Sequence, residues 1–423
     1  MSSVIWEAAA GTPLVARTVP LPDPGPLLAL LPDTGALAWV RRGEGLVGWG
    51  STLRIPTRDE RRFAAAEDAW AELTRHAVVR NEVGLPGTGP VAFGSFAFSP
   101  RSPAGGVLVV PEVVVGHRDG QWWLTTMGAG AVLPPFRTPA PARPPAPPGE
   151  VAYSDGALSA PGWEHAVATA IGRIGRGDLE KVVLARALEA RAERPVDPRW
   201  LVGRLADRYP GCWTFSVDGL VGATPEMLVR REKGLVTSRV LAGTIRRTGD
   251  DPHDLALAAR LARSSKDLEE HEYAVRSVAH ALAPHCTSTN VPEAPFVLHL
   301  ANVMHLATDV TGVLADDSSS LRLAAALHPS AAVCGTPTAS AAALIEELEG
   351  MDRDRYAGPV GWMDAQGDGE WAIALRCARL DSSDPRRARL FAGCGIVAGS
   401  DPQAELSESD AKLVPMRDAL ATR

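Results

Sequence analysis

The alternation of apolar and polar positions predicts strands and one helix in the N-terminal third of the chain. Two apolar runs on either side of a polar turn within 37–50 are typical of a β-hairpin. Residues 61–79 space their apolar side chains as an amphipathic helix does. Two further strands, joined by a short turn, are predicted at 107–115 and 121–127. This part of the chain therefore favours sheet over helix.

In the C-terminal two thirds, helical and strand patterns alternate. The pattern predicts helices at 163–176, 255–282, 339–348 and 410–420, and strands at 181–186, 361–364, 370–380 and 389–397. Many antiparallel strands with helices between them favour an α+β fold over a simple parallel βαβ series.

A proline- and alanine-rich tract, PPFRTPAPARPPAPPG at 134–149, separates the two parts. Proline lacks a backbone donor and favours extended chain, so the tract predicts a linker or loop. We therefore expect three segments: a strand-rich part at 1–133, the linker at 134–150 and a larger region at 151–423.

Composition argues against several classes of protein. Hydrophobic residues make up 45% of the 423 residues and charged residues 22%, which is typical of a globular protein and not of a disordered one. The net charge of −7 disfavours a nucleic-acid binder. No apolar run is long enough to cross a membrane, and the N-terminus lacks the pattern of a secretory signal. The five cysteines form no C-x-x-C pair, so we expect reduced thiols in a cytoplasmic protein.

Lysine is rare in this chain, since only four of the 43 basic residues are lysines. Lys181 begins a predicted strand, where alternation places it on the same face as Val183 and Ala185. Burial there would favour the neutral amine and suit it to general base catalysis, unless the side chain reaches solvent at the strand end. Glu226 follows a short turn and is either a general acid with a raised pKa or a surface carboxylate.

Two pairs of acidic residues share a spacing that suits a metal ion. Asp267 and Glu270 lie three residues apart in a predicted helix, and Glu405 and Glu408 repeat this spacing one turn before Lys412. Carboxylates that converge from two helices are typical ligands of Mg²⁺. Two solvated helix faces would show the same spacing.

Two further features would suit an anionic ligand. Gly393 and Gly395 could bring backbone amides close to an anion, although a bulged strand has the same pattern. Arg376 stands in an apolar strand, where it needs a carboxylate from the protein or from a substrate. No Ser-His-Asp elbow, Walker loop, Rossmann fingerprint or HExxH motif is present, which excludes several common enzyme classes.

Several segments together resemble the chorismate-utilising enzyme family. HPSAAVCGTP at 328–337 resembles the HP-x-x-A-x-x-G-x-P segment of that family. In family order and spacing there follow YAGPVGW, GEW, RLFAGCGIV and E-x-x-E-x-x-x-K. The resemblance covers about residues 160–420 closely and the N-terminal part loosely. It implies large antiparallel sheets packed face to face, with helices outside.

Within the family, the chain is most similar to the isochorismate synthases. Members that use water carry lysine where Lys181 stands, whereas members that use ammonia usually carry glutamine. Ala332 stands where salicylate synthases and the ammonia users tend to have threonine, and the GEW signature at 369–371 also resembles isochorismate synthases. The resemblance therefore implies Mg²⁺-dependent conversion of chorismate to isochorismate, in which water adds at C2 and the C4 hydroxyl leaves.

The resemblance also implies a role for each candidate residue. Lys181 would activate water, and Glu226 would protonate the leaving hydroxyl. The implied metal ligands are Glu270 and Glu408, with Asp267 and Glu405 nearby. The implied substrate-binding residues are Gly243, Thr244, His305, Ala332, Tyr356, Arg376, Gly393, Gly395 and Lys412.

Other functions stay open as alternatives. A salicylate synthase would go on to eliminate pyruvate, an anthranilate or aminodeoxychorismate synthase would need a glutaminase partner, and a silent protein would only bind chorismate. Ala332 argues against the first and Lys181 against the second. The presence of Lys181, Glu226 and all four acidic residues argues against the third. We expect a monomer that needs no glutaminase, nucleic acid or membrane, in a menaquinone or catechol siderophore pathway.

Overall fold

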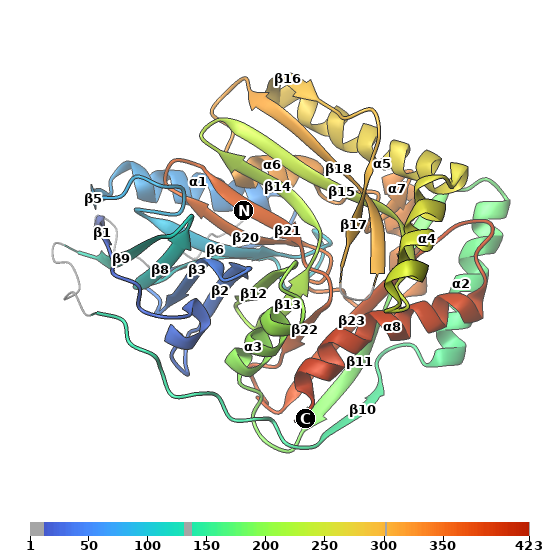
Figure 1. The fold of residues 1–423 in the computed structure, drawn as a ribbon, viewed down its shortest axis with the longest axis horizontal. Coiled ribbons are helices and arrows are strands. Elements are labelled where there is room, and N and C mark those ends of the chain that lie inside the picture. Colours follow the sequence, from blue (N-terminus) through green and yellow to red (C-terminus); the bar gives the residue numbers. More distant parts are fainter. Residues whose placement is uncertain (1–11, 131–137, 301–302, 423) are drawn as a thin grey trace.

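The computed structural model describes residues 12–130, 138–300 and 303–422, which form two large sheets packed face to face (Figure 1). Within these residues one sheet has 13 strands, in the order β10-β11-β23-β22-β13-β12-β2-β3-β8-β9-β1-β5, with β19 beside β11. The other has 10 strands, in the order β16-β18-β15-β14-β21-β20-β6-β7-β4, with β17 beside β18. Neighbouring strands are antiparallel, except that β1 and β5 run parallel.

The strands of the 13-stranded sheet are β1 (Leu14–Pro20), β2 (Leu37–Arg41), β3 (Glu44–Trp49), β5 (Val78–Asn81), β8 (Val113–Arg118), β9 (Gln121–Ala129), β10 (Val151–Asp155), β11 (Lys181–Ala192), β12 (Trp213–Val217), β13 (Leu220–Thr224), β19 (Gly335–Thr336), β22 (Cys377–Leu380) and β23 (Arg387–Ile396). Those of the 10-stranded sheet are β4 (Leu53–Thr57), β6 (Val91–Phe96), β7 (Gly106–Val110), β14 (Met227–Glu232), β15 (Leu235–Arg246), β16 (Cys286–Asn290), β17 (Phe296–His299), β18 (Val303–Leu314), β20 (Pro359–Asp364) and β21 (Gly369–Ile373).

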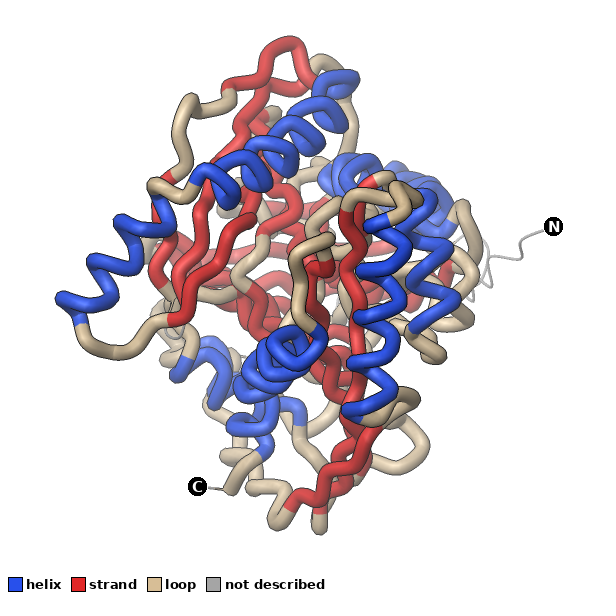
Figure 2. The backbone as a smooth tube through the Cα atoms, turned by 90° about the vertical axis from the view of Figure 1, so that its right-hand side faces the viewer, coloured by secondary structure: helices blue, strands red, loops and turns tan. Residues whose placement is uncertain are grey.

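Helices cover the outer faces of both sheets, as Figure 2 shows from the side. They are α1 (Arg62–Arg75), α2 (Ala160–Gly175), α3 (Pro198–Arg208), α4 (Asp251–Ala262), α5 (Ser265–Leu282), α6 (Ser320–Leu327), α7 (Thr338–Leu348) and α8 (Pro402–Leu420). Helices α1, α5 and α6 pack on the 10-stranded sheet, and α2, α3, α7 and α8 on the other. Two 3-10 turns, at Leu27–Leu30 and Ala283–His285, complete the described elements. The predicted α+β architecture is confirmed.

Alternation along the strands explains why the sheets pack on both faces. In β2, Leu37 and Trp39 join the apolar cluster between the two sheets, whereas Ala38 and Val40 join the cluster under α3 and α8. Trp39 Nε1 also donates a 2.8 Å hydrogen bond to Oε2 of Glu370 in the opposite sheet. The buried indole N–H therefore has an acceptor, and the two sheets are joined at this point.

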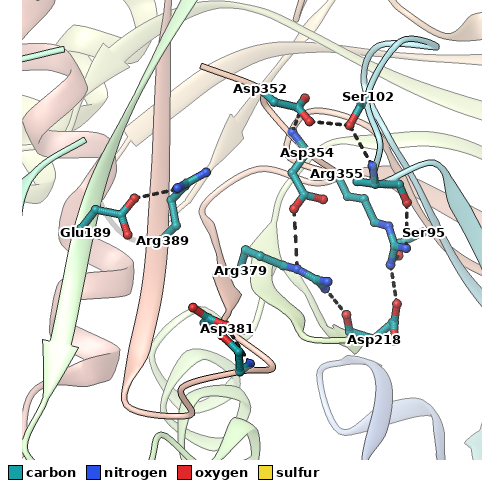
Figure 3. A network of polar contacts seen from close by, with 12 residues as sticks. Ser95, Ser102, Glu189, Asp218, Asp352, Asp354, Arg355, Arg379, Asp381 and Arg389 are labelled. Atoms are coloured by element: carbon teal, nitrogen blue, oxygen red, sulfur yellow. Dashed lines mark hydrogen bonds and ion pairs between the residues drawn. The ribbon is translucent and has the colours of Figure 1, made fainter. Parts of the chain in front are cut away.

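A second connection between the sheets is polar and centres on Asp218, in the turn between β12 and β13 (Figure 3). Arg355 Nη1 donates to Asp218 Oδ2 at 2.6 Å and to Oγ of Ser95 in β6 at 3.1 Å. Arg54 Nη2 in β4 donates to Asp218 Oδ1 at 2.6 Å. Burial alone would raise the pKa of Asp218, but Arg355 and Arg54 hold that pKa below its ordinary value.

The predicted hairpin over 37–50 is confirmed as β2 and β3, but two predicted strands are wrong as single elements. The strand predicted at 107–115 is β7 and β8, which belong to different sheets because the chain turns at Pro111, a residue without a backbone donor. The strand predicted at 370–380 likewise divides into β21 and β22 at Arg376, whose φ is +48°.

Two predicted helices also end differently in the structure. The helix predicted at 255–282 is α4 and α5, because Ser264 accepts a hydrogen bond from the Asp267 amide and begins a new helix. The helix predicted at 61–79 ends at Arg75, and its last residues belong to β5. Of the predicted linker, residues 138–150 contain no helix or strand, and residues 134–137 lie outside the described part. No helix in the described part combines the length and apolar composition that crossing a membrane requires.

Candidate active site

Lys181 is the first residue of β11 and lies between two neighbouring strands. On one side it pairs with Thr336 of β19, and on the other Val183 pairs with Gly395 of β23. A Cβ atom on residue 395 would lie 3.0 Å from Lys181 Cε. The lysine stem therefore passes over Gly395, which leaves room for it because glycine has no side chain.

Glu226 lies where the chain crosses from β13 in one sheet to β14 in the other. Its backbone amide donates a 3.3 Å hydrogen bond to Thr224 Oγ1, which shapes the turn. Burial raises the pKa of Glu226 to about 7, against the opposing charges of Arg376, Lys181 and Lys412. A carboxyl group with this pKa carries a proton in much of the population at neutral pH and can act as a general acid.

Arg376 occupies the left-handed turn between β21 and β22, and its carbonyl accepts a 3.3 Å hydrogen bond from Ala223. The guanidinium is half-buried, and no residue in the described part forms an ion pair with it. Its charge nevertheless affects Glu226, His305 and Tyr356, so it lies among the predicted site residues. A half-buried cation without a protein carboxylate suits an anionic ligand.

A bulge in the pairing of β15 with β18 positions three predicted residues together. The register shifts between Ala242 and Thr244, and Gly243 between them has a φ of +77°, which favours glycine. Thr244 Oγ1 and His305 Nδ1 are 2.9 Å apart. Burial, with smaller contributions from Arg376 and Lys412, lowers the pKa of His305 to about 3, so the imidazole is neutral. Its Nε2 is buried without a hydrogen-bond partner among the described residues.

Tyr356 and Lys412 both contact the Gly393 segment of β23. Tyr356 stacks on Phe391, with ring centroids 5.0 Å apart, and a Cβ atom on residue 393 would lie 2.9 Å from its hydroxyl. Lys412 Nζ donates a 2.9 Å hydrogen bond to the Gly393 carbonyl and forms a 2.5 Å ion pair with Glu408. The glycine at 393 thus allows the tyrosine hydroxyl to approach the strand backbone.

The first turns of α8 present two carboxylates close together. Oxygen atoms of Glu405 and Glu408 and the sulfur of Cys394 lie within 4.8 Å of one another. Burial raises the pKa of Glu405, and the charge of Glu408 raises it further. Burial raises the pKa of the Cys394 thiol to about 12, so it stays protonated and the anionic donors here are carboxylate oxygens.

The other acidic pair begins α5. Asp267 lies beside the bulge, since a Cβ atom on Gly243 would be 3.3 Å from its Cβ. Among the described side chains, Asp267 does not belong to the cluster of Glu405 and Glu408. Glu270 lies in α5, but its side chain lies outside the described residues.

Ala332 lies in the loop between α6 and β19, which is held against β11. The Cys334 carbonyl accepts from Val183 N at 2.8 Å, and the Thr336 carbonyl from Glu180 N at 2.8 Å. A Cβ atom on Gly335 would overlap the Lys181 carbonyl at 2.2 Å, so only glycine fits there. The structure thus brings the loop of Ala332 to the strand of Lys181.

The profile of the chorismate binding enzyme family matches residues 36–130 and 137–421 of this chain. The chain belongs to that family. Relatives at high coverage include the salicylate biosynthesis isochorismate synthase of Pseudomonas aeruginosa, which is 35% identical over 92% of this chain and 85% of its own. The putative isochorismate synthase MenF of Mycobacterium tuberculosis is 40% identical over 79% of this chain and 87% of its own.

A solved structure supports the same placement. The crystal structure of a putative 2,3-dihydroxybenzoate-specific isochorismate synthase, DhbC, from Bacillus anthracis matches with a TM-score of 0.76 and 31% identity. The alignment covers 93% of this chain and 98% of that one. A chorismate-binding enzyme must hold a small substrate with two carboxylates. Arg376, which forms no ion pair with a described residue, lies near Glu226 together with Lys181 and Lys412, so positive charge gathers in this part of the structure.

Sequence reasoning did not predict one polar pair behind β11. Glu349 and Arg353 are almost fully buried and form an ion pair at 2.5 Å. Glu349 Oε1 accepts from Ala185 N at 2.7 Å, and Arg353 donates to the carbonyls of Val183 at 2.6 Å and Val333 at 2.8 Å. The pair thereby satisfies β11 backbone groups in the gap between β19 and β10. A Glu-x-x-x-Arg spacing after a helix is too common to have marked it.

Proposed function

We propose that the chain is an isochorismate synthase that converts chorismate to isochorismate with Mg²⁺ as its cofactor. The observation that carries this proposal is the pairing of a lysine with a protonatable carboxyl group. Lys181 lies close enough to Glu226 for its charge to act on a carboxyl whose pKa is about 7. The relatives from Pseudomonas aeruginosa and Mycobacterium tuberculosis bear the name isochorismate synthase, the second as a putative one. Water must lose a proton to attack carbon, so a lysine base fits this reaction.

In the proposed reaction, Lys181 first releases its proton to solvent, and its free amine then accepts a proton from water as the oxygen bonds to C2 of the ring. The ring double bonds shift, and the C4–oxygen bond breaks. Glu226 gives its proton to the departing hydroxyl, so one water enters and one water leaves. The site is then reset when the proton on Lys181 returns to Glu226 through solvent. The raised pKa of Glu226 matches its role as the acid.

The substrate would be held by its two carboxylates. We assign the enolpyruvyl carboxylate to Arg376, with the Tyr356 hydroxyl and the backbone at Gly393 and Gly395 beside it. Gly243 and Thr244 would contact the ring carboxylate, and the neutral His305, whose Nε2 lacks a partner, would donate or accept one hydrogen bond. Ala332 would line the pocket from its loop, and Lys412 would keep the Gly393 strand in place.

The carboxylates of α8 fit a hard divalent cation. Glu405 and Glu408 lie close together, and burial and the charge of Glu408 raise the pKa of Glu405, an effect that a bound cation would oppose. Mg²⁺ bound there would neutralise the ring carboxylate and fix its orientation. We assign Glu408 and Glu270 as ligands, with Asp267 and Glu405 completing the site. Lys412 already pairs with Glu408, so metal and lysine would share that carboxylate.

We also propose that the enzyme is cytoplasmic and monomeric, and that it needs no glutaminase subunit. All five cysteines are free thiols, which suits a reducing compartment. Water is the nucleophile in the proposed reaction, so no source of ammonia is required. The names of the relatives include both MenF and DhbC, and we place the chain at the shared step that supplies isochorismate.

The test is direct product analysis. Purified protein is incubated with chorismate and Mg²⁺, without ammonia, and the products are separated by chromatography, with EDTA as a control. We expect isochorismate in equilibrium with chorismate, and loss of turnover after chelation. Salicylate with pyruvate would instead assign the chain to the salicylate synthases. Turnover that needs ammonia would overturn the role of Lys181, and no turnover under either condition would indicate a silent binder.

A further inference from the structure

A second cleft, separate from the site described above, lies between the start of α1, the loop at 98–103 and α7. Its volume is about 960 Å³, within the range that small-molecule pockets occupy. Lys181, Glu226 and Arg376 do not line it. Its apolar lining includes Phe63, Phe98, Ala325, Ala342, Ile345 and Met351.

The inner end of this cleft holds a cation that has no counter-ion among the described residues. Arg62 is 5% exposed and donates to the carbonyls of Asp59, Ala97 and Phe98 at 3.2 to 3.4 Å. These hydrogen bonds are long, and no ion pair involves Arg62 in the described part of the chain. Burial lowers the pKa of Arg62 to about 10. Burying an arginine without a carboxylate is costly, and an anionic ligand would offset that cost.

The neighbouring titratable groups leave a net charge of +1 at this inner end. Arg353 is neutralised by its ion pair with Glu349. Burial, with smaller contributions from the charges of Arg62 and Arg353, lowers the pKa of His328 to about 3, so His328 is neutral. Its Nε2 lies 3.0 Å from the Phe98 carbonyl.

Apart from the buried Glu349, which pairs with Arg353, the acidic residues of the cleft lie at its rim. Glu60 and Asp352 are exposed there, and Asp352 accepts from Ser102 Oγ at 2.6 Å (Figure 3). Glu346 forms an exposed ion pair with Arg101. Negative charge at the opening and positive charge at the inner end specify one orientation for an anion, with its charged group innermost.

Aromatic side chains surround the inner end as well. The rings of Phe63 and Phe98 each lie 5.8 Å from the His328 ring, and Arg62 lies 4.6 Å above Phe63. Such an arrangement accommodates a planar apolar body by offset or edge-to-face contact. One buried cation beside three rings therefore selects a ligand with one carboxylate and one ring.

We propose that this cleft binds a small aromatic monocarboxylate, with the carboxylate on Arg62 and the ring beside Phe63, Phe98 and His328. The cleft shares a wall with the chorismate site, because the Glu349–Arg353 pair lines the cleft and also bonds the backbone of β11 and the Ala332 loop. An occupant therefore acts on the strand that begins with Lys181, and it changes turnover without competing with chorismate.

The binding test uses phenylacetate as the probe and calorimetry on the full-length protein. Arg376→Met removes carboxylate binding at the chorismate site. Phenylacetate should bind to this variant as tightly as it binds to the wild type. Arg62→Met should weaken binding by about tenfold or more, as expected for loss of a charged hydrogen-bond partner. Arg101→Met, at the rim, is the matched control and should change binding by less than about twofold.

A second variant tests the cleft without touching Arg62. Ala342→Trp should fill the cleft and abolish phenylacetate binding, and kcat of this variant should no longer respond to added phenylacetate. Phenylacetate at saturating chorismate should change kcat of the wild type but not of Arg62→Met. The proposal is overturned if phenylacetate gives no heat of binding, or if phenylacetamide binds equally tightly. It is also overturned if binding is lost in Arg376→Met but kept in Arg62→Met, or if kcat is unaffected by a bound probe.

Discussion

A Cβ atom on residue 395 would lie 3.0 Å from Cε and 3.6 Å from Nζ of Lys181. The absence of a side chain at Gly395 therefore leaves room for the end of the lysine side chain. We predict that Gly395→Ala moves the amine away from the ring of the substrate. A displacement of about 1 Å costs roughly a hundredfold in rate, so kcat should fall by about that factor. Initial rates of isochorismate formation measure the effect.

The matched control is Gly399→Ala, because a Cβ atom there meets no other atom within 4 Å. Gly399→Ala should leave kcat near the wild-type value, and both variants should unfold at similar denaturant concentrations. Wild-type activity in Gly395→Ala would show that the position of Lys181 does not limit catalysis.

Replacement of Glu226 by glutamine should lower activity and raise stability. Its pKa of about 7 lies above the ordinary 4.5, so the folded protein holds a proton that the unfolded chain releases between these pH values. Stability is therefore lost as pH rises through this window. Glu226→Gln keeps the shape without the charge and should raise the free energy of unfolding at pH 8 by about 3 kcal/mol, while lowering kcat by roughly 10²- to 10⁴-fold.

Urea titrations at pH 5 and pH 8 separate these two effects. The free energy of unfolding of Glu226→Gln should exceed that of the wild type at pH 8, and the difference should be small at pH 5. In the wild type, kcat/KM should decline as pH rises above about 7, because the acid is then ionised. Equal stability of the variant and the wild type at both pH values would mean that the pKa of Glu226 is not raised.

The sequence pattern predicted the elements of the fold better than their sheet membership. The 37–50 hairpin is local, so its alternation and polar turn suffice to predict it. The segments 107–115 and 370–380 were each predicted as one strand, yet each divides between two sheets. The breaks at Pro111 and Arg376 depend on where the chain must cross the sandwich, and that is set by packing between distant strands.

The candidate site was predicted from motifs, not from periodicity. Spacing alone could not separate Glu405 and Glu408 from an ordinary helix face, and the resemblance to a family made them candidates. The structure brings them within 4.8 Å, together with Cys394. Glu349 was beyond prediction because its partner groups are backbone atoms of a distant strand, and no local pattern encodes that contact.

Lys181→Met tests the assignment of the base. Methionine keeps an unbranched apolar stem of similar length, so the packing over Gly395 should persist while the amine is lost. We expect isochorismate formation to fall by roughly 10²- to 10⁴-fold, with chorismate binding changed much less. Lys233→Met, at an exposed turn between β14 and β15, is the control. Binding of chorismate is followed by calorimetry, and normal turnover in Lys181→Met would remove Lys181 from the mechanism.

Glu408→Gln tests the metal assignment and its link to Lys412. Glutamine cannot neutralise a divalent cation, so the Mg²⁺ concentration for half-maximal activity should rise by roughly tenfold or more, the range that loss of even an outer-shell metal partner causes. Glu347→Gln, in α7, is the matched control, since its carboxylate pairs only with the exposed Arg173 among the described residues.

Comparison with Lys412→Met distinguishes a metal-binding role of Glu408 from a structural role through its ion pair with Lys412. Glu408→Gln also removes the 2.5 Å ion pair with Lys412. The Lys412 ammonium group, which donates a hydrogen bond to the Gly393 carbonyl, then loses the carboxylate that helps to hold it in place. If Glu408 acted only through that contact, Lys412→Met would reproduce the behaviour of Glu408→Gln, and added Mg²⁺ would restore neither. If Glu408 binds the metal, high Mg²⁺ should recover activity in Glu408→Gln but not in Lys412→Met. An unchanged Mg²⁺ requirement in Glu408→Gln would contradict the assignment.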